Sequence, residues 1–65
     1  MIGDRLRIAL DQNNMTQKDL AKKAHITESS VCRYLQNQRG VTDRTLRAIC
    51  DVLDVSADWL IGREK

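Results

Sequence analysis

The chain lacks several residue types on which other classes of protein depend. Its 65 residues include no Pro, no Phe and only three Gly, and its large aromatic residues are Tyr34 and Trp59. Residues that prefer strands rarely alternate with polar ones, so the pattern favours an all-α fold over a sheet. A chain of this length allows one small core, and we expect a single domain over residues 1–65.

Few cysteines and short apolar runs exclude further classes. The two cysteines, Cys32 and Cys50, are too few for a disulfide framework and lack metal-ligand spacing, so we expect no metal and no cofactor. No apolar run approaches the roughly 18 residues of a membrane span, and the N-terminus carries no signal-peptide core. We therefore expect a reduced, cytoplasmic setting without a membrane partner.

Positive charge gathers in the middle of the chain. The net charge is only +2, but residues 16–45 hold six Lys or Arg against three Asp or Glu. From residue 46 onward, three basic residues face four acidic ones. Phosphates of nucleic acid attract a basic region of this kind. An ordinary solvated surface explains the same distribution, so charge alone does not decide between the two.

Residues 17–35 carry the most informative pattern, which reads as two short amphipathic helices joined by a tight turn. Apolar residues occur where the two helices would face each other or fill the turn: Leu20, Ala21, Ala24, Ile26, Val31 and Tyr34. This layout is typical of a helix-turn-helix, whose second helix is left free to enter a DNA groove. We predict this motif over about residues 17–36.

Capping residues divide the chain into five helices. The spacing of its apolar residues predicts a first helix over residues 2–12, ending near Asn13 and Asn14. Hydroxyl N-caps then predict four further helices, which begin after Thr16, Thr27, Thr42 and Ser56. Asp19 would complete a capping box with the first of these caps. The expected ends lie near Gln36, Leu53 and Leu60, with Asn37 suited to a left-handed position after the third helix and Gly62 expected to stop the fifth.

His25 lies in the predicted turn, where the backbone of a helix-turn-helix tends to adopt a positive φ. Glycine suits that conformation best, and His, Asn and Asp tolerate it better than other residues. A metal or catalytic role would need His, Cys or carboxylate partners, and the sequence places none beside it. We predict a conformational role for His25.

Several short motifs in a fixed order carry a family resemblance. They are Thr-Gln-x-x-Leu-Ala at 16–21, Ile-Thr at 26–27, Leu-x-x-Ile at 46–49, Leu-x-Val-Ser at 53–56 and Asp-Trp-Leu-Ile-Gly at 58–62. Together they resemble the lambda-repressor-like, Cro-type helix-turn-helix family of phage repressors and bacterial regulators. The resemblance covers nearly the whole chain and implies a compact five-helix domain whose third helix lies in the major groove of DNA.

The resemblance also implies which residues grip the DNA backbone. Gln17 matches the family's glutamine that touches a phosphate, beside unpaired amides at a helix N-terminus that favour anions. By position, the further residues expected at phosphates are Thr27, Asn37, Gln38, Arg39 and Arg44. Such contacts set the register of a protein on DNA and carry no sequence information themselves.

The expected base-reading residues lie on the face of the third helix opposite Val31 and Tyr34. They are Glu28, Ser29, Cys32, Arg33 and Gln36. Arg33 is the strongest candidate, because its planar fork can hold guanine O6 and N7 together and discriminate by about 1–3 kcal/mol. Glu28 could accept a hydrogen bond from a cytosine amino group, and Cys32 could fill space beside a thymine methyl. For each residue the alternative is an ordinary solvated polar face.

The chain departs from the family pattern in two places. Family members often carry Glu in place of Leu35 and Gly in place of Asn37, and in some of them that Glu pairs with an Arg in place of Leu10. We predict that an apolar contact replaces the buried ion pair, because desolvating two charges is costly. The hypothesis requires the Leu10 and Leu35 side chains within about 4.5 Å of each other.

Trp59 allows two interpretations, which can hold together. In one it seals the fifth helix against the first or fourth. In the other it forms a dimer contact with neighbouring residues, since aromatic residues are enriched at interfaces: Ala57, Leu60 and Ile61. A homodimer on a pseudo-palindromic operator is expected because one recognition helix covers too few base pairs for genomic specificity.

The sequence therefore predicts a sequence-specific regulator that binds double-stranded DNA. The preferred interpretation is a repressor of phage or prophage type. Its expected location is the cytoplasm of a bacterial cell or phage-infected host, associated with the nucleoid. The alternative is a helical protein-interaction module of the same fold, antitoxin-like or an adaptor, with little DNA binding. An enzyme is disfavoured, because neither paired carboxylates nor a phosphate loop accompany the single His.

Overall fold

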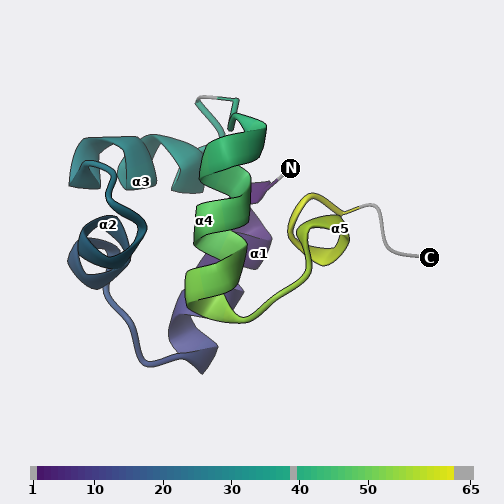
Figure 1. Ribbon diagram of the computed structural model, residues 1–65, viewed down its shortest axis with the longest axis horizontal. Helices are drawn as coiled ribbons and strands as arrows, with labels where there is room; N and C mark the ends of the chain where they lie inside the picture. Colours follow the sequence, from purple (N-terminus) through teal and green to yellow (C-terminus); the bar gives the residue numbers. More distant parts are fainter. Residues whose placement is uncertain (1, 39, 63–65) are drawn as a thin grey trace.

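A computed structural model of the chain describes residues 2–38 and 40–62. Regular structure in this part of the chain is entirely helical: α1 (Ile2–Gln12), α2 (Gln17–Ala24), α3 (Glu28–Leu35), α4 (Asp43–Leu53) and α5 (Ala57–Leu60). In Figure 1, α2 and α3 lie on one side of α4 and α5 lies on the other. The expected all-α, five-helix architecture is confirmed. Within the described ranges, no helix has the length and apolar character needed to cross a membrane.

Hydroxyl side chains start four of the five helices, as the sequence predicted. At Thr16, Thr27, Thr42 and Ser56 the side-chain oxygen accepts a hydrogen bond from the backbone N–H three residues further on. At α2 the exchange is reciprocal, since the Thr16 N–H donates to Asp19 Oδ2 at 3.1 Å and the Asp19 N–H donates to Thr16 Oγ1 at 3.1 Å. The hydrogen bond that the Asp19 carboxylate accepts from the Thr16 N–H, followed by the one from the Thr16 side chain, holds the pKa of Asp19 below its ordinary value.

The first four helices end in the same way without using glycine. Each is followed by a residue in the left-handed region, with φ between 51° and 59°: Asn14, His25, Asn37 and Asp54. The N–H of the next residue returns to a carbonyl five positions earlier, which is the Schellman arrangement. The expected left-handed conformations of His25 and Asn37 are confirmed, and Gly62, which was expected to stop the fifth helix, also has a positive φ of 80°. Short polar side chains tolerate this region better than other non-glycine residues do.

The core holds the inner face of the helix-turn-helix in place. The predicted helix-turn-helix residues of α2 and α3 are buried, with Val31 fully enclosed, and Ile26 in the turn is half-buried. α2 packs on α3 and α4, while α1 packs on α3 and α5. Ile8, which lies off the apolar stripe of α1, is 47% exposed. Since burial fixes one face of α3, its other face is presented to solvent.

Two side chains bind the remaining helices together. Asn13 Nδ2 donates to the Ala9 carbonyl at 2.8 Å and to the Leu53 carbonyl at 3.2 Å, which satisfies an acceptor at the end of α4. The Arg5 guanidinium lies 5.3 Å from the centroid of the Trp59 ring, and Arg5 Nη1 donates to the Trp59 carbonyl at 2.8 Å. The half-buried Trp59 thus seals α5 against α1, as the first of its two interpretations predicted.

Candidate nucleic-acid interface

The outer face of α3 carries the predicted base-reading residues together. Glu28, Ser29, Arg33 and Gln36 are exposed and Cys32 is half-buried, whereas Val31 and Tyr34 on the inner face belong to the core. Glu28 lies in the first turn of the helix and Arg33 in its last turn, so each charge is placed favourably with respect to the helix dipole. This face can offer both hydrogen-bond donors and acceptors to a ligand.

A hydroxyl pair organises the start of α3. Thr27 Oγ1 accepts from the Ser30 N–H at 3.0 Å and donates its proton to Ser30 Oγ at 2.9 Å. Because a hydroxyl has one proton to give, Thr27 would donate to a phosphate only if that proton turned away from Ser30 Oγ. Its exposed position is compatible with the phosphate role expected from the sequence, but the hydroxyl already serves as a cap.

A weak hydrogen bond joins two of the predicted base-reading residues, one turn apart. Gln36 Nε2 donates to Cys32 Sγ at 3.5 Å. This contact sets the Gln36 amide along the outer face of α3 and leaves its carbonyl oxygen and second N–H proton for other partners.

The second cysteine, Cys50, lies in the core. Burial raises the pKa of its thiol, and the neighbouring Asp51 carboxylate raises it further, so the thiol stays protonated.

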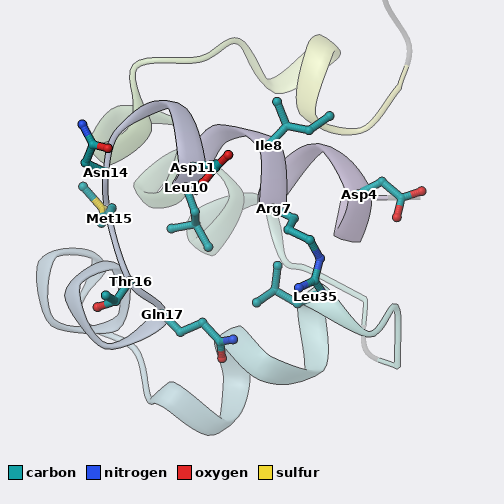
Figure 2. Close-up of a pocket in the computed structure, with 10 residues that line it drawn as sticks. All are labelled: Asp4, Arg7, Ile8, Leu10, Asp11, Asn14, Met15, Thr16, Gln17 and Leu35. Carbon is teal, nitrogen blue, oxygen red and sulfur yellow. The ribbon is translucent and has the colours of Figure 1, made fainter.

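Gln17 lies at the start of α2, beside an open groove formed with α1 and the end of α3 (Figure 2). Its side chain is exposed, as a phosphate contact requires. Leu10 and Leu35 point into the same groove, and each is only 6% exposed. Both leucines are therefore buried beside one groove, while the contact within about 4.5 Å that the hypothesis requires stays a prediction.

Beyond α3, the chain places the other expected phosphate-binding residues at the surface. Asn37, Gln38 and Arg44 are exposed, with Arg44 in the first turn of α4, whereas Arg39 lies outside the described residues. Asn37 has a structural role that sequence reasoning missed, because its Oδ1 accepts the N–H of Gly3 at 2.9 Å. In the sequence, this role was indicated by the presence of Asn at a position where family members often have Gly.

Of the four residues expected at a dimer contact, one lies elsewhere. Leu60 is fully buried in the core, so its assignment to an intermolecular surface is wrong. It packs inward because α5 is anchored on both α1 and α4. Ala57, Trp59 and Ile61 are half-buried and remain at the surface of α5 and its C-terminal cap.

Across residues 2–38 and 40–62, no three His, Cys, Asp or Glu side chains gather as metal ligands would. In the same ranges, every buried side-chain nitrogen or oxygen has a hydrogen-bond partner.

Comparison with known proteins places the whole arrangement in a family. The helix-turn-helix family model matches residues 6–60. Two proteins of Bacillus subtilis (strain 168) are similar over 64 residues, or 98% of this chain: the HTH-type transcriptional regulator ImmR, at 30% identity, and the HTH-type transcriptional regulator YqaE, at 33%. The matched part is 50% and 55% of their respective lengths, so the chain spans about half of each relative. No solved structure matches significantly.

Proposed function

The chain belongs to the helix-turn-helix family, and from this premise we propose that it binds double-stranded DNA sequence-specifically and regulates transcription. One observation carries the proposal. The outer face of α3 presents four exposed polar side chains and Cys32, while the inner face is locked into the core. A helix held in this way can enter the major groove, which is about 12 Å wide, without disturbing the fold.

Within the groove, the side chains of α3 make different contacts with the bases. Arg33 donates two hydrogen bonds to one guanine, and Glu28 accepts from a cytosine amino group. Ser29 donates or accepts according to the base, and Gln36 acts at the edge of the contact together with Cys32. Since Glu28 also repels phosphates, it disfavours registers in which the start of α3 meets the DNA backbone.

Contacts on both sides of α3 would hold the domain to the phosphates. Gln17 contacts one side from the first turn of α2, where the helix dipole favours an anion. Asn37, Gln38 and Arg44 grip the other side from the end of α3 and the start of α4. These groups fix the register within which the base-reading residues act.

The proposed active form on DNA is a homodimer. Ala57, Trp59 and Ile61 provide the contact between the two copies, whose α3 helices would read half-sites about 34 Å apart on a pseudo-palindromic operator. Repression is the proposed mode of action, because occupying a promoter is sufficient to block it. The protein would then act in the cytoplasm, on the nucleoid. The phage or prophage type is a further proposal, which the genes beside its own would test.

Selection of bound sequences from a pool of random duplexes tests this function. The expected result is an enriched motif with two inverted half-sites separated by about one helical turn. A single enriched half-site would retain DNA reading but reject the dimer. Recovery of the random pool without enrichment would reject the function and favour a protein-interaction module.

A further inference from the structure

One hydrogen bond links the start of α1 to the end of α3. The N–H of Gly3 donates to Asn37 Oδ1 at 2.9 Å, across 34 positions of sequence. Gly3 stands in the first turn of α1, where backbone N–H groups have no acceptor within their own helix. Asn37 is the left-handed residue that follows α3. The side chain that follows α3 thus supplies an acceptor for an N–H at the start of α1.

The two backbones approach closely at this point. A Cβ atom added to Gly3 would collide with the Leu35 carbonyl oxygen and lie 2.9 Å from Asn37 Oδ1. Glycine is therefore required at position 3 by packing. A close backbone contact with a hydrogen bond across it resists sliding of one helix end past the other.

We propose that Asn37 is a positioning residue, which sets the angle of α3 by holding its C-terminal end against the start of α1. The inference rests on the proposed function, because the angle of α3 matters only if its outer face reads DNA. Core contacts with α2 and α1 hold the body of α3, and the bond to Gly3 holds its C-terminal end. Loss of the second anchor lets the helix pivot, and two simultaneous hydrogen bonds from Arg33 to one base tolerate little displacement.

This role differs measurably from the phosphate contact expected of Asn37. A phosphate contact uses the donor Nδ2 and strengthens binding to every duplex alike. The positioning role uses the acceptor Oδ1 and strengthens binding to the selected duplex above that to an unrelated one. The ratio of the two affinities separates the roles.

Asn37→Gly removes the side chain while keeping a residue that accepts the φ of 58°. Asn14→Gly is the matched control, since Asn14 occupies the equivalent left-handed position after α1 with φ 51°. In the free protein, hydrogen exchange at the Gly3 N–H should accelerate about tenfold in Asn37→Gly and stay unchanged in Asn14→Gly. Asn37→Asp keeps an acceptor oxygen and should restore slow exchange.

Affinities for the selected and an unrelated duplex, measured at one salt concentration, complete the test. We expect the ratio of the two to fall about two- to tenfold in Asn37→Gly, as for the loss of one hydrogen bond, and to hold in Asn14→Gly. Equal weakening on both duplexes, or an unchanged ratio, would overturn the positioning role and leave DNA reading intact. A wild-type protein without any preference would instead reject the proposed function, and Gly3 exchange would still report whether the bond exists.

Discussion

Single residues at the helix ends carry much of the local structure. Thr16 and Asp19 satisfy each other's backbone N–H groups at the start of α2, directly beside the predicted phosphate contact Gln17. His25 and Asn37 turn the chain at the ends of α2 and α3 without glycine. Because the effects at Thr16, Asp19 and His25 are confined to a few neighbouring atoms, substitutions there give results that can be assigned to one group.

The capping box makes the stability of α2 depend on pH. The folded state lowers the pKa of Asp19 below 3.8, so its stabilising effect is fully present above that pH and is lost as the pH falls through the folded-state pKa. Asp19→Asn removes the titration but keeps an acceptor oxygen. Thermal unfolding of both proteins between pH 7 and pH 2 should show a wild-type advantage that shrinks below about pH 4. A difference that does not change with pH would contradict this assignment.

The two cysteines should differ in reactivity and in protection by DNA. Cys32 is half-buried on the outer face of α3, whereas Cys50 is 8% exposed and the pKa of its thiol is raised. Because the thiolate is the reactive form, iodoacetamide should label Cys32 first. Saturating amounts of the selected duplex should slow labelling of Cys32 and leave Cys50 unaffected, as mass spectrometry would show. Unchanged labelling of Cys32 on DNA would remove it from the interface.

At the scale of a single element, the two faces of α3 have different roles. Its inner face stabilises the domain, and its outer face is available to a ligand. Substitutions on the two faces should therefore change different measured quantities.

Val31→Ala should lower the free energy of unfolding by about 1–3 kcal/mol, because it leaves a cavity at a fully buried site. Ser29→Ala on the exposed face of the same helix should change it by less than about 0.5 kcal/mol. Urea unfolding monitored by circular dichroism measures both. Comparable losses from the two substitutions would mean that the outer face also contributes to folding.

Helix boundaries followed from the sequence because their causes are local. The N-caps at Thr16, Thr27, Thr42 and Ser56 and the left-handed residues His25 and Asn37 depend on atoms a few positions away. By contrast, the hydrogen bond from Gly3 to Asn37 and the stacking of Arg5 on Trp59 join positions far apart in sequence, so only the packed fold reveals them. Leu60 was misassigned for the same reason, since the neighbours that bury it come from other helices.

For the whole molecule, the distribution of charge determines how binding should respond to salt. Basic residues outnumber acidic ones two to one over residues 16–45, the part that includes the helix-turn-helix. The logarithm of affinity should fall linearly with the logarithm of salt concentration, with a slope of about −0.9 for each phosphate neutralised.

Arg44→Ala should reduce the magnitude of that slope by about 1 while leaving base preference unchanged, because a phosphate contact carries no sequence information. Arg47→Ala is the control, since it removes the same charge from an exposed position further along α4 and should change the slope less. Fluorescence anisotropy with a labelled duplex gives both slopes. Equal effects of the two substitutions would make the salt response a property of net charge alone.

The most direct measurement of base reading by α3 is the affinity of wild-type protein and Arg33→Ala for the selected duplex with each base pair changed in turn. In the wild type, replacing the guanine held by Arg33 should cost about 1–3 kcal/mol. In Arg33→Ala, changing the base pair at that position should no longer change the affinity, while preferences at the other positions persist. If Arg33→Ala keeps the wild-type preference at every position, Arg33 does not read DNA and the proposed orientation of α3 is wrong.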